Sequence, residues 1–185
     1  MNMKRLFILG SGGFGRTVGE AAKLTGDWEE IAMLDDNFPQ VSLSGHFEVV
    51  GRSQDLKRIA AGYDAAICAI GNGQVRKKLT ESILDTGLSL ATIIHPRAYV
   101  SADATVGAGT SIMAGVVVGP YAKVGRGCIL NANATADHDS IMEDYAHLGV
   151  GVAIAGSATL REGAWLQAGR SAGYGVDVPA WEVWK

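Results

Sequence analysis

A six-residue repeat covers the second half of the chain and restricts its fold more than any other feature. From His95 to Trp184 the sequence divides into fifteen consecutive hexads, from HPRAYV to PAWEVW, without one inserted residue. The sixth position of every hexad is apolar, and the fourth is small or β-branched in thirteen of the fifteen, the exceptions being Arg170 and Glu182. Side chains two residues apart in a strand share one face, so both positions are expected to point to the same interior.

This repeat predicts a left-handed parallel β-helix. Glycine, asparagine or aspartate often follows the apolar sixth position, where a flat strand must turn a corner and a left-handed backbone costs these residues least. Three hexads make one triangular coil of eighteen residues, so fifteen hexads make about five coils of a solenoid. A β-sandwich would need turns of varying length, and a strict spacing of six does not provide them.

The first 94 residues have a different pattern, in which short apolar runs alternate with helix-like stretches. Strands are predicted at residues 6–9, 31–34, 47–50, 65–70 and 89–94, and helices at 16–24, 53–61 and 74–86. Ser53 is the predicted N-cap of the second helix. The alternation is typical of a three-layer α/β domain. We therefore expect a Rossmann-like α/β domain at residues 1–94 and an all-β left-handed β-helix at residues 95–185.

Composition excludes several classes of protein. The chain has 16 basic and 19 acidic residues and a formal net charge of −3, which argues against a nucleic-acid partner and against a polybasic membrane anchor. No apolar run reaches membrane-spanning length, and the start has too short an apolar run for a signal peptide. Cys68 and Cys128 form neither a disulfide framework nor a zinc-ligand set, so we expect a reduced cytoplasmic protein without a metal site.

A glycine motif stands between the first predicted strand and the first predicted helix. Gly10, Gly12 and Gly15 satisfy G-x-G-x-x-G, and Asp35 follows Gly15 by 20 residues, the spacing of a dinucleotide fingerprint. The motif indicates close approach of the backbone to a ligand, with a helix N-terminus aimed at phosphate. It leaves the nucleotide open, and it is also compatible with a tight strand–helix turn. A domain of about 90 residues leaves little room for the second nucleotide half of a redox enzyme.

Five segments, taken in order, resemble the PglD/NeuD-type sugar acetyltransferases, which belong to the hexapeptide acyltransferases. They are GSGGFG, LDDN, AIGNGQVRKKL, IIHPRAYVSADATVG and ADHDSIMEDYAHLGVGV, and together they extend over nearly the whole chain. The resemblance implies a homotrimer that binds acetyl-CoA in clefts between neighbouring β-helices. It also implies N-acetylation of a nucleotide-linked amino sugar, expected to be a 4-amino-4,6-dideoxyhexose, in the bacterial cytoplasm.

The candidate catalytic residue is His138, in the sequence Asp137-His138-Asp139. It is the second residue after inward Ala136, which predicts a position at a corner or on the outer surface of the β-helix. A base with a pKa near 6.5 can take the proton of a sugar amine at physiological pH. The resemblance gives Asp139 the role of orienting the imidazole, and Asp137 is expected to be structural.

The resemblance also places the two substrates. His147 precedes inward Leu148, so its side chain should leave the prism, and it matches a family histidine that touches acetyl-CoA. Small residues on the outer wall would let the pantetheine arm approach the backbone, and the register gives Gly156 and Ala168 as candidates.

For the sugar nucleotide, the resemblance implies that Gly12, Gly13 and Phe14 lie near the diphosphate, Asp35 and Asp36 near the base or ribose, and Gly71 near the sugar. Phe14 stands where the family commonly has a histidine. The basic run of Arg76, Lys77 and Lys78 is compatible with a phosphate contact, but its pattern favours a solvated helix face.

Two other functions remain compatible with the sequence. The same base could serve O-acetylation of a sugar hydroxyl, including sialic-acid-type sugars. The chain could also be a non-catalytic trimeric scaffold that binds sugar nucleotides. Cys128 falls in the inward register of the repeat, so a covalent thiol nucleophile is not expected.

Overall fold

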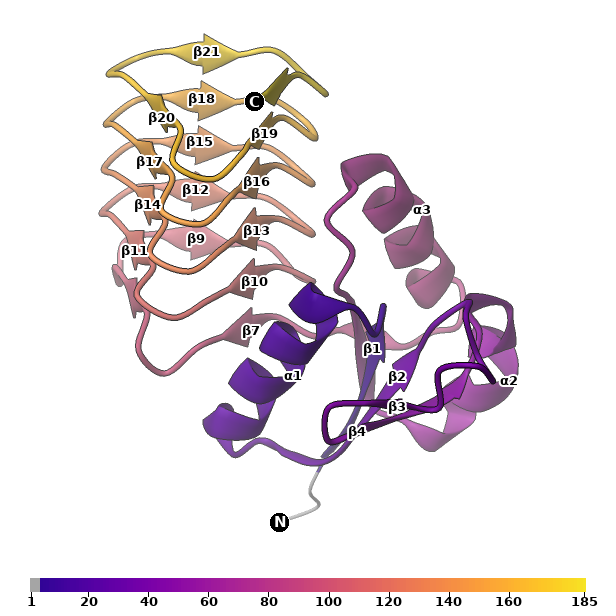
Figure 1. The fold of residues 1–185 in the computed structure, drawn as a ribbon. Coiled ribbons are helices and arrows are strands. Elements are labelled where there is room, and N and C mark those ends of the chain that lie inside the picture. Colours follow the sequence, from indigo (N-terminus) through magenta and orange to yellow (C-terminus); the bar gives the residue numbers. More distant parts are fainter. Residues whose placement is uncertain (1–3) are drawn as a thin grey trace.

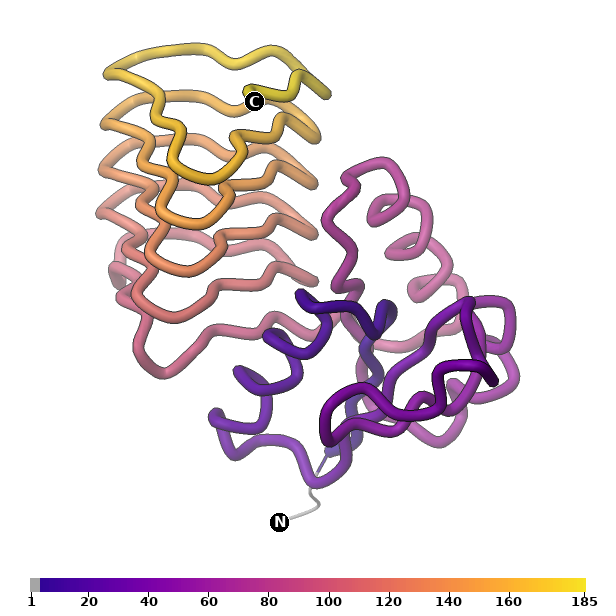
Figure 2. The backbone as a smooth tube through the Cα atoms, viewed as in Figure 1, coloured from indigo at the N-terminus to yellow at the C-terminus, as the bar shows by residue number. Residues whose placement is uncertain are grey.

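The computed structural model describes residues 4–185 and has two parts that lie side by side, a small α/β domain and a triangular β-helix (Figure 1). The backbone tube climbs coil by coil from the junction to the C-terminus, which lies at the far end of the prism (Figure 2). Within residues 4–185, no helix is both long and apolar enough to cross a membrane.

The α/β domain is built on a six-stranded sheet in the order β3-β4-β2-β1-β5-β6, parallel except for the β3–β4 pair. Apolar side chains on both sheet faces form two clusters, one beneath α1 and one beneath α3 and the short helices. The elements are β1 (Lys4–Leu9), α1 (Gly13–Thr25), β2 (Trp28–Leu34), β3 (Leu43–Ser44), β4 (Phe47–Gly51), η1 (Ser53–Asp55), α2 (Leu56–Ile59), η2 (Ala60–Gly62), β5 (Ala65–Cys68), α3 (Gly73–Leu84) and β6 (Ser89–Leu90).

The predicted elements of this domain are confirmed with two corrections. The helix expected at residues 53–61 is a chain of short turns, η1, α2 and η2, and Ser53 does not cap it. Arg52 is the N-cap of η1, and Ser53 instead donates from its backbone N–H and its hydroxyl to Oδ1 of Asp36. The strand expected at residues 89–94 is two strands, because β6 pairs with β5 whereas the last two residues join the β-helix.

The second part is the parallel β-helix that the hexads predict. Each two-residue strand pairs with the strand eighteen residues later, so that three flat sheets enclose one core. The first sheet contains β7 (Ile93–Ile94), β10 (Ser111–Ile112), β13 (Ile129–Leu130), β16 (His147–Leu148), β19 (Trp165–Leu166) and β22 (Val183–Trp184). The second contains β8 (Tyr99–Val100), β11 (Val117–Val118), β14 (Thr135–Ala136), β17 (Ala153–Ile154) and β20 (Ser171–Ala172). The third contains β9 (Thr105–Val106), β12 (Lys123–Val124), β15 (Ile141–Met142), β18 (Thr159–Leu160) and β21 (Asp177–Val178).

The two inward columns of the repeat form the core of the prism. Aliphatic residues of the sixth hexad position, such as Leu130 and Leu160, are fully buried together with small residues of the fourth position, such as Ala134 and Ala164. Burial of this apolar column is the main stabilising contribution, at about 25 cal/mol for each Å² removed from water. Arg170 and Glu182, the two exceptions to the repeat, are exposed. The strands that follow them, β20 and β22, nevertheless form.

The first sheet of the prism packs on the α/β domain. Ile93 of β7 and Met113, which follows β10, belong to the same buried cluster as residues of α1. On the other side of the contact, α3 lies along the prism (Figure 1), and Lys77 forms a 2.7 Å ion pair with Glu162. The two parts therefore share an apolar and a polar interface.

Arg76 is the centre of that interface, and its place corrects the expectation of a solvated basic helix face. Its side chain is 1% exposed. The guanidinium donates to the carbonyls of Ile70 and Gly71 at 2.8 and 2.9 Å on its own domain, and to those of Gly127 (2.7 Å) and Tyr145 on the β-helix. One buried cation thus joins two backbone carbonyls of each part. Lys77 beside it is paired with Glu162 rather than free.

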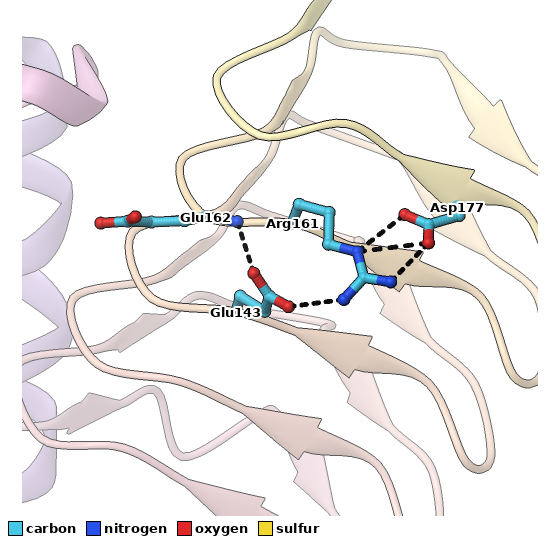
Figure 3. Close-up of polar contacts among 4 residues, drawn as sticks. All are labelled: Glu143, Arg161, Glu162 and Asp177. Carbon is cyan, nitrogen blue, oxygen red and sulfur yellow. Dashed lines mark hydrogen bonds and ion pairs between the residues drawn. The ribbon is translucent and has the colours of Figure 1, made fainter.

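An ion-pair ladder runs along the outer corner of the prism (Figure 3). Arg161 donates to both carboxylate oxygens of Asp177 and, at 2.9 Å, to Oε1 of Glu143. The other oxygen of Glu143 accepts the backbone N–H of Glu162. The hydrogen bonds from Arg161 lower the pKa of Asp177. Three successive coils are therefore connected on the outside as well as by their strands.

We expect Arg161→Met to lower the melting temperature, because it removes the cation that Glu143 and Asp177 share. Exposed ion pairs weaken as salt screens them, so the loss should shrink when ionic strength rises from about 0.05 to about 0.5 M. Thermal unfolding followed by circular dichroism at both salt concentrations measures it. Lys123→Met is the matched control, since Lys123 is exposed on the same face and its side chain makes no hydrogen bond or ion pair within residues 4–185. A loss that is the same at both salt concentrations would contradict the electrostatic explanation.

Candidate active site

His138 lies at the corner between the second and third sheets of the prism, in the turn from β14 to β15. Its side chain is 47% exposed. Nδ1 lies 2.8 Å from Oδ2 of Asp139, and the backbone N–H of His138 donates to Oδ1 of Asp137 at 2.8 Å. Asp139 itself has the left-handed φ of 58° that closes the corner. The turn therefore aims a carboxylate at one ring nitrogen and leaves Nε2 without a hydrogen-bond partner among the described residues.

The electrostatics of this turn favour a strong base. The hydrogen bond that Asp139 accepts from Nδ1 and the negative charge of Asp137 raise the pKa of His138 above its usual value. Asp137 lies 3.9 Å from Nε2, too far for a hydrogen bond. An imidazole in this setting has one nitrogen fixed by a carboxylate and the other free to accept a proton from an incoming group.

His147 faces out of the prism, as the register predicts, but the α/β domain covers it. It lies on β16 and is 7% exposed, with its ring stacked on that of Trp165 at 4.9 Å between centroids and 3° between planes. Burial, with the nearby charge of Arg76, lowers the pKa of His147 to about 3, so the ring is neutral at physiological pH. Both of its nitrogens and Nε1 of Trp165 are buried with no hydrogen-bond partner among the described residues.

His147 and Trp165 border a cavity of about 230 Å³ between the two parts of the molecule. On the α/β domain, Gly71 of the loop after β5 and the first residues of α3 line this cavity. On the prism, His147, Trp165 and Trp181 line it. A Cβ at Gly71 would lie 3.9 Å from Cε1 of His147, so two residues assigned separately from the sequence, Gly71 and His147, lie together. The buried ring nitrogens and indole N–H can serve a polar ligand atom such as a carbonyl oxygen.

Sequence reasoning missed Trp165, Trp181 and Arg76 as lining residues of this cavity. Trp181 is the outer corner residue of the last coil, with φ 62°, and its indole covers Gly163 of the coil before. Its ring also approaches Gly73, where a Cβ would lie 3.2 Å from Cζ3. The eighteen-residue spacing between Gly163 and Trp181 was the available signal, because it puts a bulky side chain next to a glycine.

The glycine loop between β1 and α1 has the conformation that its motif predicts. Gly10 has φ 104°, and Gly12 is the N-cap of α1. A Cβ on Gly15 would lie 2.0 Å from the carbonyl oxygen of Gly10, so only glycine allows this strand and helix to pack so closely. Gly12 and Gly13 are exposed, and Phe14 packs against the apolar cluster beneath α1.

Asp35 closes this loop from the neighbouring strand. Its Oδ2 accepts the backbone N–H and the hydroxyl of Ser11, and its Oδ1 accepts the backbone and side-chain N–H groups of Asn37. These bonds outweigh the effect of burial and lower the pKa of Asp35. Asp36 uses only Oδ1, which accepts from Ser53, in the contacts described. Asp35 and Asp36 both border a small cavity of about 140 Å³ at the carboxyl ends of β1 and β2.

Within one chain, the sequence-predicted residues fall into separate places. His138, Asp139 and Gly156 lie at the corner between the second and third sheets, His147 lies on the opposite first sheet, and Ala168 lies at the corner between the first and second. The glycine loop lies on the α/β domain, beyond the first sheet (Figure 1). One copy therefore does not bring the histidine–aspartate pair to either cavity.

The two cysteines have no reactive environment. Burial raises the pKa of both Cys68 and Cys128 to about 12, so neither thiol is ionised at physiological pH. This agrees with the inward position expected for Cys128. Among the residues that the structure describes, no three His, Cys, Asp or Glu side chains gather as a metal-ligand set.

Comparison with known proteins gives consistent matches over both parts. The family described as PglD N-terminal domain matches residues 5–83. The UDP-N-acetylbacillosamine N-acetyltransferase of Bacillus subtilis (strain 168) is 35% identical over 115 residues, which are 60% of this chain and 52% of that protein. The aligned part thus spans about half the length of the Bacillus enzyme.

Solved structures match over nearly the full length. GDP-perosamine N-acetyltransferase from Caulobacter crescentus, a histidine-to-alanine variant in complex with CoA and GDP-perosamine, has a TM-score of 0.86 at 31% identity, covering 96% of this chain and 91% of that one. The acetyltransferase domain of PglB from Neisseria gonorrhoeae FA1090, in complex with acetyl coenzyme A, has a TM-score of 0.82 at 29% identity, covering 98% and 96%.

A hexapeptide β-helix with an exposed histidine–aspartate pair at one corner and a Rossmann-like domain docked on one face defines an acyltransferase of the hexapeptide class. More narrowly, the length and identity of the Caulobacter match and the N-terminal family match assign the family. The chain belongs to the PglD/NeuD-type sugar acetyltransferases.

Proposed function

We propose that the protein transfers the acetyl group of acetyl-CoA to the amine of a nucleotide-linked amino sugar, with His138 as the general base. The observation that carries this proposal is the 2.8 Å contact between Nδ1 of His138 and Asp139 at an exposed corner of the prism. Structures of two relatives with acetyl-CoA, or with CoA and GDP-perosamine, support the substrate classes. We expect the sugar to be a 4-amino-4,6-dideoxyhexose.

The chemistry is a direct transfer without an acyl-enzyme. The neutral amine attacks the thioester carbonyl as Nε2 of His138 accepts an amine proton, and a C–N bond forms. The tetrahedral intermediate then expels the CoA thiolate as the C–S bond breaks, and the imidazolium returns its proton to sulfur. Asp139 stabilises the imidazolium between these steps. The high thiol pKa values of Cys68 and Cys128 support direct attack rather than a covalent cysteine.

For the sugar nucleotide, we propose a site on the α/β domain, residues 1–94. The backbone N–H groups of Gly12, Gly13 and Phe14 lie at the N-terminus of α1, a position that suits a diphosphate. Asp35 would shape the loop, since its oxygens already accept four hydrogen bonds, and the second oxygen of Asp36 would accept a ribose hydroxyl or a base N–H. Gly71 would lie on the sugar side.

For acetyl-CoA, we propose that the pantetheine arm follows the outer wall of residues 95–185 near His147, Gly156 and Ala168. The buried, unpartnered nitrogens of His147 and Trp165 fit a carbonyl oxygen of this co-substrate. His147 is neutral, so one nitrogen can donate without placing a charge beside the thioester.

We propose a homotrimer, as the family resemblance implies, and the separation of these residues supports an assembly of more than one copy. His138 and the cavity beside His147 lie on opposite sides of one prism, so a second copy must supply the corner that completes each site. The outward column of the second sheet, which borders His138, carries no charge and offers a surface for such packing: Tyr99, Val117, Thr135, Ala153 and Ser171. We place this assembly in the bacterial cytoplasm, where acetyl-CoA is available.

The test is an assay of thiol release. The purified protein is incubated with acetyl-CoA and UDP-, dTDP- and GDP-linked amino sugars, and free CoA is followed with a thiol reagent. Turnover with 4-amino sugars and none with their hydroxyl analogues is expected. Turnover with hydroxyl sugars alone would replace the proposal with O-acetylation, and binding without any thiol release would replace it with a scaffold role. Tight binding of a nicotinamide nucleotide would instead indicate a redox protein.

A further inference from the structure

The imidazole of His138 occupies the space directly over the backbone of Gly156. Gly156 is eighteen residues further along the chain, at the same corner one coil later. A Cβ at residue 156 would lie 2.5 Å from both Cε1 and Nε2 of the ring and 3.0 Å from Nδ1. Real Cβ contacts do not occur at 2.5 Å, so any side chain at this position would force the ring to move.

The backbone conformation at residue 156 does not require a glycine. Other corner glycines that lie beneath a ring, Gly127 under Tyr145 and Gly163 under Trp181, have left-handed φ values of 61° and 66° and would be favoured at those corners in any case. Gly156 is not among the residues with positive φ. Alanine could therefore adopt its backbone conformation, and the ring of His138 is the obstacle that remains.

The ring is held from two sides. Asp139 fixes Nδ1 through the 2.8 Å contact within the turn, and the bare backbone of Gly156 supports the opposite part of the ring from the next coil. A rotation that relieved a clash at residue 156 would carry Nδ1 away from Asp139. The position of the imidazole and its hydrogen bond are thus coupled through a residue that carries no functional group.

We propose that Gly156 is a positioning residue for His138, whose missing side chain keeps the imidazole against Asp139 with Nε2 available to the substrate amine. The proposal rests on the proposed function for its catalytic part. It differs from the cofactor contact assigned to Gly156 above, because it acts through the histidine and makes its own prediction for the free enzyme.

The charges around His138 make its titration a suitable probe. Asp137 and Asp139 come from its own turn. The coil before contributes Pro120 at the equivalent position, and the coil after contributes Gly156, neither of which titrates. Loss of the Asp139 contact should therefore lower the pKa of His138 toward the ordinary value of about 6.5.

The experiment compares Gly156→Ala with Gly173→Ala. Gly173 also lacks a left-handed φ, and a Cβ there would make only one ordinary contact, 3.8 Å from Cγ2 of Val176. We expect Gly156→Ala to lower the His138 pKa measured by NMR titration of the ring protons and to reduce kcat about 10- to 100-fold, since small displacements of a catalytic group have effects of this size. The acid limb of the kcat profile should move to lower pH. Gly173→Ala should change neither quantity.

A double variant separates positioning from other roles. Gly156→Ala combined with Asp139→Asn should lower kcat by much less than the product of the two single effects, because both act on the same ring. An unchanged His138 pKa in a folded Gly156→Ala protein would overturn the proposal, and a rise in KM for acetyl-CoA alone would assign Gly156 to the cofactor. The NMR titration needs no substrate, so it decides the positioning role even if the wild-type protein releases no thiol.

Discussion

Replacing His138 with alanine should reduce kcat for acetyl transfer about 10²- to 10⁴-fold, the usual contribution of a positioned general base. The side chain is half exposed, so the fold should be preserved and the melting temperature should change little. Thiol release measured with saturating acetyl-CoA and amino sugar tests the result. His46→Ala serves as control, because His46 is an exposed turn histidine with no described contact.

The pH dependence of the same reaction provides an internal check. His138 must be unprotonated to accept a proton, and Asp139 raises its pKa, so wild-type kcat should rise with pH through a value above about 6.5. Asp139→Asn should move this limb to lower pH and lower the plateau, since the imidazolium loses its carboxylate. A His138→Ala protein that keeps wild-type turnover, or an acid limb unaffected by Asp139→Asn, would remove the proposed base.

The largest effect on stability is expected from Arg76→Ala. The change removes the donor from four backbone carbonyls at the interface, those of Ile70, Gly71, Gly127 and Tyr145. Each buried acceptor left without a partner costs about 1–3 kcal/mol, and relaxation makes the costs less than additive. We therefore expect a loss of about 3–5 kcal/mol in the free energy of unfolding, measured by urea denaturation.

Two variants show whether the shape of the guanidinium is responsible. Arg76→Lys keeps the charge but cannot reach four carbonyls with the same planar geometry, so it should recover only part of the loss. Lys77→Ala removes a partly exposed ion pair with Glu162 and should cost far less. If Arg76→Ala were as mild as Lys77→Ala, the two parts of the molecule would be held together mainly by the apolar contacts of α1.

The β-helix could be predicted in detail because its pattern is local. Inward residues such as Val118 and Leu148 follow from a count of six, and the strand register follows from a count of eighteen. The Asp139 contact was also within reach, because it joins adjacent residues in one turn. In the α/β domain, alternating apolar runs identified the principal strands and helices, although not the short β3.

The surroundings of Arg76 and His147 could not be predicted, because they depend on how one part docks on the other. The sequence indicates that both side chains point away from the element that carries them. The periodicity does not show that α3 and the first sheet of the prism pack together and bury them. A basic residue on an amphipathic helix is usually exposed to water. The sequence pattern around a buried basic residue such as Arg76 looks the same. Ser53 failed as a cap for a related reason, since Asp36 of another segment competes for it.

The contacts of α3 also limit how this protein can change length. Arg76 and Lys77 reach Gly127, Tyr145 and Glu162, which belong to successive levels of the prism. A duplication of eighteen residues between those levels would preserve every strand pairing and still separate the helix from its anchors. Because Trp181 also approaches Gly73 at the start of α3, whole coils can be added only beyond residue 181 without disturbing this helix. The number of coils below that point is fixed by the helix that spans them.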